Sequence, residues 1–267
     1  MFEVALIGAG TMGQAMLSAW LDSGALAQSD IVISEKDEVR RGEVAGRYGV
    51  AQAETVAAAA AGSRVVVLAV KPQDSEPVLG ELAGALEAGA TLVSIAAGLT
   101  IAYIRDKVGA APTVVRVMPN MAAQVRASVS AFSVDAGEKS AARERVVDLL
   151  SAFGQTVEVD EGLMNIVTAV SGSGPAYFFL MVEALEEAGV IGGLDRATAS
   201  MLARETLWGA AKVLQETGRR AGELREAVSS PGGTTLAALG EFERSGFEDM
   251  MRAAVEAASK RAGELAR

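Results

Sequence analysis

The chain of 267 residues contains no cysteine and no histidine. Without them it can form no disulfide, thiolate nucleophile or Ser-His-Asp triad, and the usual zinc sites are excluded. We therefore expect no metal site. Any catalysis must use other side chains or a bound organic cofactor.

Basic residues are also scarce, since 24 lysines and arginines face 34 acidic residues for a net charge of −10. A chain with this balance lacks the basic field that attracts phosphate backbones, so we expect no nucleic-acid partner. The opening sequence MFEVALIGAG has no basic signal-peptide region, and no apolar stretch of about 18 residues lacks a charge or a turn signal. We expect a cytoplasmic protein without a membrane partner.

Residues 1–160 alternate short β-branched runs with alanine-rich helical stretches. Continuous Val, Ile and Leu runs are typical of strands buried on both faces of a parallel sheet, with helices between them. Half of all residues are apolar, which is enough for such a core. The sequence predicts an α/β Rossmann-type domain, with strands at 2–8, 30–34, 64–70, 91–97, 113–118, 128–134 and 156–159.

Residues 161–267 lack such runs and are rich in helix-forming residues, which predicts an all-helical domain. Helices are expected at 176–190, 195–217 and 234–264, with Gly189, Gly218 and Gly246 as breaks. The stretch YFFLMV at 177–182 is apolar on every side. It is buried either within its own domain or in a dimer interface. We favour the interface, because a domain of about 105 residues has little room for a helix buried all round.

The sequence IGAGTMG places Gly8, Gly10 and Gly13 directly after an apolar strand and at the start of a helix. The first glycine permits a tight turn, the second lets the backbone approach a pyrophosphate, and the third lets the helix pack against the strand. The helix N-terminus offers free N–H groups and its positive dipole end to phosphates. In this βαβ context the pattern predicts dinucleotide binding rather than a purely structural turn.

The segment ISEKDEVRR, at the end of the second strand, carries signals for both nicotinamide dinucleotides. An acidic residue at this position binds the ribose 2′-hydroxyl of NAD, and Glu35 fits that role. Basic residues accept the 2′-phosphate of NADP, and Lys36, Arg40 and Arg41 fit that one. The sequence leaves NAD and NADP open.

Three further strand ends lie where a doubly wound sheet opens its ligand crevice. Lys71 in AVKP is either a surface lysine or lies along the dinucleotide, and its place at a strand end favours the second role. SIAAG at 94–98 ends in small residues, which suits the close approach of a cofactor. Asn120 in RVMPN is equally well a turn residue or a functional one.

Two C-terminal motifs combine glycine, proline and hydroxyl residues. VSGSGPAY at 170–177 suits a helix that begins at its proline, and its serines and glycines also let a ligand approach backbone amides. SSPGGTT at 229–235 suits a turn in which one helix ends at Val228 and Thr234 or Thr235 caps the next. A cap needs one hydroxyl residue and this loop has four. The loop is therefore also a candidate anion site built from amides and hydroxyls.

Together, IGAGTMG, AVKP, SIAAG, RVMPN, VSGSGPAY and SSPGGTT resemble the motifs of the pyrroline-5-carboxylate reductase family, in order and over essentially the whole chain. The resemblance implies a Rossmann-type domain and a helical dimerisation domain that interleaves with a partner's, with dimers assembling into decamers in several members. It implies reduction of 1-pyrroline-5-carboxylate to L-proline with NADPH, NADH also being possible. Met121 departs from the pattern, because threonine is common after MPN.

The resemblance also implies roles for residues at matching positions. Thr235 is expected to contact the ring nitrogen of the substrate, and Ser230 with the loop amides to take its carboxylate, so these two are the catalytic candidates. The expected substrate-binding residues are Glu161, Ser230, Gly233, Thr234 and Thr235. From the motifs and strand ends together, the expected cofactor-binding residues are Gly8, Ala9, Gly10, Thr11, Met12, Gly13, Glu35, Lys36, Ala69, Val70, Lys71, Pro72, Ala96, Ala97, Gly98 and Asn120.

Two alternative functions stay open. Another two-domain Rossmann imine or 3-hydroxyacid oxidoreductase would share the glycine motif. Hydroxyacid enzymes of this kind use a lysine in the helical domain, and Lys212 and Lys260 lack a matching motif. A non-catalytic NAD(P)-sensing protein would keep IGAGTMG and have no use for SSPGGTT.

Overall fold

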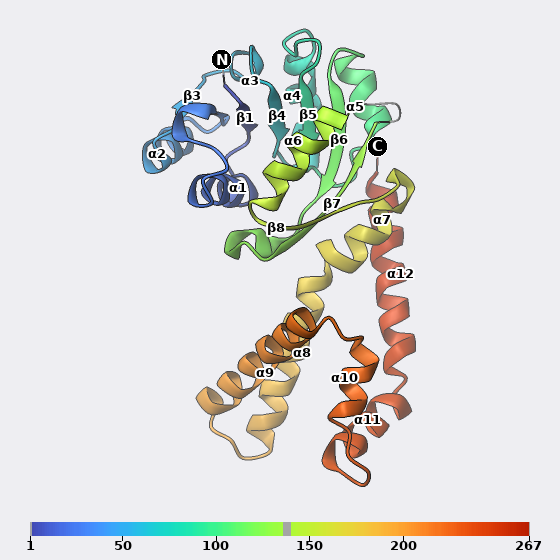
Figure 1. Cartoon of the computed structure of the whole chain (residues 1–267). Helices are drawn as coiled ribbons and strands as arrows, with labels where there is room; N and C mark the ends of the chain where they lie inside the picture. The colour runs from blue at the N-terminus through green and yellow to red at the C-terminus, as the bar shows by residue number, and fades with distance from the viewer. Residues whose placement is uncertain (1, 136–139, 267) are drawn as a thin grey trace. The chain divides into compact units, whose positions relative to one another are not determined.

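The computed structural model describes residues 2–135 and 140–266 (Figure 1). The chain divides into two compact units. The first, here called the sheet unit, comprises Met1–Ser173 and Ala257–Arg267. The second, here called the helical unit, comprises Gly174–Glu256.

The sheet unit is built on eight strands in the order β3-β2-β1-β4-β5-β6-β7-β8. Neighbouring strands pair in parallel except β6 and β7, which are antiparallel. Each predicted strand is present, and the Rossmann-type fold is confirmed. Sequence reasoning missed β3, because its two residues form no apolar run. The strands are β1 (Val4–Ile7), β2 (Ile31–Ser34), β3 (Ala51–Gln52), β4 (Val65–Leu68), β5 (Thr91–Ser94), β6 (Thr113–Met118), β7 (Ser128–Val134) and β8 (Gly154–Glu158).

Helices cover both faces of this sheet, because alternate strand residues point to opposite sides. On one face Leu6 packs with Trp20 of α1, whose indole N–H donates to the carbonyl of Leu149 in α6 at 2.9 Å. On the other face Ile7 packs into a cluster that includes Leu79 of α4. The helices are α1 (Thr11–Asp22), α2 (Glu38–Tyr48), α3 (Val56–Ala60), α4 (Ser75–Leu82), α5 (Ile101–Val108) and α6 (Ser140–Ser151), with short 3₁₀ turns η1 (Gln28–Asp30), η2 (Pro72–Asp74) and η3 (Met121–Val125).

Residues 161–173 complete the sheet unit with three short helical pieces: η4 (Glu161–Leu163), α7 (Met164–Val167) and the π-helical η5 (Thr168–Gly172). A Cβ at Gly172 would meet the terminal methyl of the flexible Met118 side chain, so this turn packs closely against the end of β6. Single π turns are rare in proteins, and those that occur are often found at functional sites. The first half of VSGSGPAY is therefore helical, and α8 begins at Gly174 with Pro175 in its first turn, as the sequence predicts.

The helical unit contains α8 (Gly174–Ile191), α9 (Arg196–Thr217), α10 (Ala221–Ala227), α11 (Thr234–Arg244) and the first part of α12 (Phe247–Leu265). The predicted break at Gly189 is wrong, because Gly189 lies inside α8. A Cβ there would press on Ala199, so glycine lets α8 and α9 pack closely. Gly218 ends α9 with a φ of +61°, and Gly246 separates α11 from α12, as predicted.

Large apolar side chains of the helical unit are mostly exposed within this chain. Among its residues, all of which the structure describes, Gly174, Ala199 and Ala203 alone are buried. Phe178 and Leu180 of α8 are 58% and 65% exposed. Burial of YFFLMV inside its own domain is therefore wrong, and the stretch needs a covering surface from elsewhere.

By length and composition alone, the helical run Glu161–Ile191 could cross a membrane. The sequence predicts a charge or a turn signal in every apolar stretch of this length, but the glycines and proline of SGSGP lie in helical segments and do not end this run. The test is weak evidence, because an apolar helix that packs against another protein chain also passes it.

Candidate functional site

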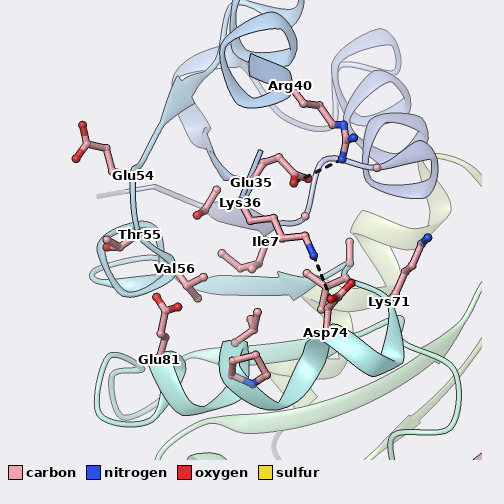
Figure 2. Close-up of a pocket in the computed structure, with 17 residues that line it drawn as sticks. Ile7, Glu35, Lys36, Arg40, Glu54, Thr55, Val56, Lys71, Asp74 and Glu81 are labelled. Carbon is pink, nitrogen blue, oxygen red and sulfur yellow. Dashed lines mark hydrogen bonds and ion pairs between the residues drawn. The ribbon is translucent and has the colours of Figure 1, made fainter. Parts of the chain in front are cut away.

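A pocket of about 520 Å³ opens in the sheet unit at the carboxyl ends of β1, β2 and β4 (Figure 2). The strand order reverses here, because β2 and β4 lie on opposite sides of β1. Ligands of open α/β sheets bind at such a point. The pocket is therefore the candidate dinucleotide site.

The glycine loop beside this pocket has the backbone that its pattern requires. Gly8 has a φ of +99°, and a Cβ there would press on the backbone of Ala69. A Cβ at Gly13 would run into the carbonyl of Gly8. α1 begins at Thr11 with Gly10 as its N-cap and without a side-chain cap. The first amides of α1 are thus free of a side-chain cap and available to an anionic ligand.

Glu35 follows β2 and turns its carboxylate toward the glycine loop. Its side chain is only 7% exposed, Oε2 accepts from the Ala9 N–H at 2.9 Å, and Oε1 accepts from the Asp37 N–H at 3.1 Å. Figure 2 shows Arg40 beside it and the ion pair between Lys36 and Asp74. The acidic and basic signals that the sequence left open therefore lie at one pocket.

Seven of the predicted cofactor residues line this pocket: Gly8, Gly10, Glu35, Lys36, Ala69, Val70 and Lys71. The others lie outside its wall: Ala9, Thr11, Met12, Gly13, Pro72, Ala96, Ala97, Gly98 and Asn120. Sequence reasoning missed Thr55 and Val56 at the start of α3 and Pro77 and Val78 in α4, which also line it. No motif singles these residues out, because only the folded sheet brings α3 and α4 to the ends of the strands.

Two of the predicted cofactor residues have structural partners. Asn120 is the N-cap of η3, where its Oδ1 accepts from the Ala122 N–H at 3.0 Å. Gly98 has a φ of +80°, and a Cβ there would press on the backbone of Leu265 at the end of α12. The structure thus shows the turn role of Asn120 and a packing reason for Gly98, and their cofactor roles stay predictions.

Glu161 also lies in the sheet unit, half-buried between β6 and α5. Its Oε1 accepts from the Ile101 N–H at 2.7 Å and from a guanidinium nitrogen of Arg116 at 3.2 Å. Arg116 is buried, so this ion pair is largely shielded from water. A carboxylate at the first turn of a helix also interacts favourably with the helix dipole. Glu161 therefore holds the start of α5, which directly follows the segment SIAAG.

The loop 229–235 lies in the helical unit between α10 and α11. α10 ends with Val228 as its C-cap, as predicted. The prediction that Thr234 or Thr235 caps the next helix is wrong, because α11 begins at Thr234 and its N-cap is Gly233, without a side-chain cap. A Cβ at Gly233 would press on the hydroxyl and the backbone carbonyl of Ser230, so glycine suits this close approach.

The hydroxyls of the loop therefore do not cap α11. The Ser229 hydroxyl donates to the Arg225 carbonyl of α10 at 2.6 Å. Ser230 and Thr234 are exposed, and Thr235 is half-buried. With the first amides of α11 beside them, these hydroxyls form a group of donors that suits a small carboxylate.

Comparisons with known proteins assign both parts of the chain. A family model described as pyrroline-5-carboxylate reductase dimerisation matches residues 161–265, and one described as NADP oxidoreductase coenzyme F420-dependent matches residues 3–98. The pyrroline-5-carboxylate reductase of Mycobacterium tuberculosis is 42% identical, over 99% of this chain and 97% of its own length. That of Pseudomonas aeruginosa is 41% identical, with the same coverage of both chains. The chain belongs to the pyrroline-5-carboxylate reductase family.

Solved structures of the family agree with the fold. A pyrroline-5-carboxylate reductase from Coxiella burnetii has a TM-score of 0.95 at 32% identity, covering 100% of this chain and 99% of its own. The Plasmodium falciparum enzyme, solved with NADP bound, has a TM-score of 0.87 at 26% identity, covering 100% and 98%. The family resemblance and the oxidoreductase class expected from the sequence are confirmed.

Family membership also explains the exposed apolar side chains of the helical unit. The dimerisation model covers α8 to α12, including YFFLMV. These helices therefore belong to a dimerisation region, which accounts for apolar faces left uncovered in a single chain.

Proposed function

We propose that this protein reduces 1-pyrroline-5-carboxylate to L-proline by hydride transfer from NADH or NADPH, the last step of proline biosynthesis. The observation that carries the proposal is the full-length match to reductases of this name, which spans both the glycine loop and the loop 229–235. An oxidoreductase of this kind needs no protein nucleophile, which suits a chain without histidine or cysteine.

The dinucleotide binds in the sheet unit, with its pyrophosphate on the amides at the start of α1. Support comes from the uncapped N-terminus of α1 and from the close approach that Gly8 and Gly13 permit. Pocket residues Val56, Pro77 and Val78 offer an apolar wall for the adenine ring. When bound, the nicotinamide supplies a hydride to the imine carbon of the substrate.

The substrate carboxylate binds to the loop 229–235. The first amides of α11 and the hydroxyl of Ser230 donate hydrogen bonds to it, because a helix N-terminus and its N–H groups favour an anion. Thr235 hydrogen-bonds the ring nitrogen, which takes the electron pair of the C=N bond and a proton as the hydride adds to carbon. Holding the imine in one orientation lowers the barrier by converting an encounter into a positioned reaction.

Glu161 supports this chemistry from the sheet unit. The family resemblance implies a role for it near the substrate. Its Oε1 is held by the Ile101 N–H and by Arg116. A carboxylate held in this way keeps one orientation, which is what a substrate-binding role requires.

The protein works as a homodimer in the cytoplasm, and the dimers can assemble into decamers as in several family members. The dimer is supported by the dimerisation model over residues 161–265 and by the exposed apolar side chains of α8. We favour a protein partner over a membrane for α8, because the matched model describes dimerisation.

One assay tests substrate, cofactor and enzyme status together. Purified protein is mixed with 1-pyrroline-5-carboxylate and NADH or NADPH, and the loss of nicotinamide absorbance is followed. We expect oxidation that depends on this substrate. Turnover of unrelated cyclic imines but not of 1-pyrroline-5-carboxylate would favour a general imine reductase instead.

A further inference from the structure

The pocket in the sheet unit holds a buried carboxylate beside the glycine loop, which bears on the choice between NADH and NADPH. The two differ at one position, where the adenosine ribose of NADH carries a 2′-hydroxyl and that of NADPH carries a 2′-phosphate with nearly two negative charges. In dinucleotide-binding folds this position lies beside the residue at the end of the second strand, about 20 residues beyond the glycine motif. Glu35, directly after β2, occupies that place.

Glu35 is a buried anion held in one orientation. The amides of Ala9 and Asp37 bond its two oxygens at 2.9 and 3.1 Å. A carboxylate has only acceptor sites, so it can accept a hydrogen bond from a 2′-hydroxyl but can donate none to a phosphate. Because its side chain is largely removed from water, repulsion of a nearby phosphate is weakly screened.

The basic residues that would accept a 2′-phosphate already have partners. Lys36 pairs with Asp74 at 3.0 Å. Arg40 lies 3.6 Å from the Glu35 carboxylate, and Arg41 donates to the Glu35 carbonyl at 3.1 Å. A 2′-phosphate would compete with these oxygen atoms for the same three cations, and moving Arg40 away would leave the buried Glu35 carboxylate without its cation.

The wall of the pocket is acidic on balance. It contains four carboxylates and three basic side chains, so one negative charge is in excess before any nucleotide binds (Figure 2). The carboxylates are Glu35, Glu54, Asp74 and Glu81, and the basic side chains are Lys36, Arg40 and Lys71. A 2′-phosphate adds charge of the same sign, whereas a 2′-hydroxyl adds none.

We propose that this pocket prefers NADH over NADPH and that Glu35 sets the preference. Glu35 accepts the 2′-hydroxyl of NADH and repels the 2′-phosphate of NADPH. The inference rests on the proposed function in that a nicotinamide dinucleotide is taken as the ligand.

Binding of the two dinucleotides without substrate tests this directly. NADH and NADPH are titrated into the full-length protein at one fixed salt concentration, and both Kd values are obtained from nicotinamide fluorescence or calorimetry. We expect NADPH to bind at least about tenfold more weakly. A wild-type protein that binds NADPH as tightly as NADH, or more tightly, would overturn the proposal without any variant being needed.

Two variants then assign the preference to one residue. Glu35→Gln keeps the shape of the side chain and removes its charge, and we expect the two Kd values to approach each other to within about threefold, mainly through tighter NADPH binding. Glu38→Gln removes a carboxylate from the first turn of α2, outside the pocket wall, and should leave the ratio of the wild type. A folded Glu35→Gln variant with an unchanged ratio contradicts the role of Glu35.

The outcome is separable from that of the proposed function. A protein that prefers NADH in binding but does not reduce 1-pyrroline-5-carboxylate loses the proposed function and keeps this inference. A protein that reduces this substrate and binds NADPH more tightly keeps the function and loses the inference.

Discussion

The sheet unit and the helical unit differ most in where their apolar side chains lie. In the sheet unit, β1, β2, β4 and β5 are buried along their whole length. In the helical unit, residues as large as Phe178 and Trp208 are more than half exposed. The first unit satisfies its apolar surface within one chain. The second leaves a surface that one chain cannot cover, which fits its match to a dimerisation model.

This difference separates two kinds of site. The dinucleotide pocket is lined by residues that the sheet itself positions, so its geometry belongs to a single chain. The loop 229–235 belongs to the unit that matches the dimerisation model. We therefore expect nucleotide binding to survive changes that abolish dimerisation, and substrate turnover to be lost with the dimer.

A charged residue introduced on α8 is expected to have the largest effect, because it should abolish dimerisation and leave nucleotide binding intact. Leu180→Glu places an unpaired carboxylate on an apolar face, and we expect association to weaken by about 3–5 kcal/mol, because a buried charge without a partner is strongly unfavourable. Sedimentation should show monomers, with reductase activity lost and NADH binding retained.

Val39→Glu is the matched control, since Val39 is equally exposed but lies on α2 of the sheet unit. It should sediment as the wild type does. A Leu180→Glu variant that still sediments as a dimer and remains fully active would contradict the assignment of α8 to the interface.

Removal of one hydroxyl from the helical unit tests the substrate loop. Thr235→Val keeps the shape of the side chain and removes the proposed bond to the ring nitrogen. The transition-state stabilisation measured by kcat/KM should therefore decrease by about 1.5–3 kcal/mol. Dimerisation and NADH binding should not change. Thr217→Val is the control, because the Thr217 hydroxyl donates within α9 to the Val213 carbonyl. Equal kcat/KM for wild type and Thr235→Val would remove Thr235 from the mechanism.

A methyl group in the glycine loop tests the sheet unit, because it should weaken nucleotide binding and leave the dimer intact. Gly13→Ala forces a Cβ against the carbonyl of Gly8, and the strain of about 1–3 kcal/mol should weaken NADH binding while the dimer persists. Gly46→Ala, in the exposed last turn of α2, meets no neighbouring atom and should stabilise the protein by about 0.5–1 kcal/mol. If calorimetry gives both variants the wild-type Kd for NADH, the close packing of Gly13 is not needed for binding.

The smallest expected effect is local to α9 and depends on pH. Asp195 caps this helix, and its bonds from the Thr198 hydroxyl and then the Thr198 amide hold the pKa of its carboxyl below the ordinary value of 3.8. A lowered folded-state pKa stabilises the fold above the ordinary pKa, and the contribution is lost as the pH falls through the folded value. Asp195→Asn should therefore lower Tm by about 1–2 °C at pH 7 and have no effect well below pH 3.8. A Tm difference that does not change with pH would mean that the charge is irrelevant.

The sheet was predictable because its strands are buried on both faces and read as continuous apolar runs. β6 has the predicted bounds, and so has β7, although serine alternates with apolar residues in its sequence SVSAFSV. Rules based on local sequence were less reliable for helix boundaries, because contacts with residues from other segments also determine where a helix begins or ends. Gly189 reads as a break along the sequence, but contact with Ala199 makes it an interior residue of α8. Thr234 and Thr235 read as caps, but close contact with Ser230 puts Gly233 in that place.

The candidate site was predictable only where a backbone requirement leaves a trace in the sequence. Gly8 and Gly13 are such cases, because a side chain would not fit at either position. Val56 and Pro77 are ordinary apolar residues that reach the pocket only through the packing of α3 and α4, so no local pattern marks them. Glu161 bonds to Ile101 and Arg116, which are distant in the sequence, so no local pattern predicts these contacts either.

The central claim is that this chain converts 1-pyrroline-5-carboxylate into proline at the expense of a nicotinamide dinucleotide. The most direct measurement quantifies proline by mass spectrometry after incubation of the wild-type protein with 1-pyrroline-5-carboxylate and NADH. We expect one proline to form for each NADH oxidised. NADH binding without any proline formation would contradict it.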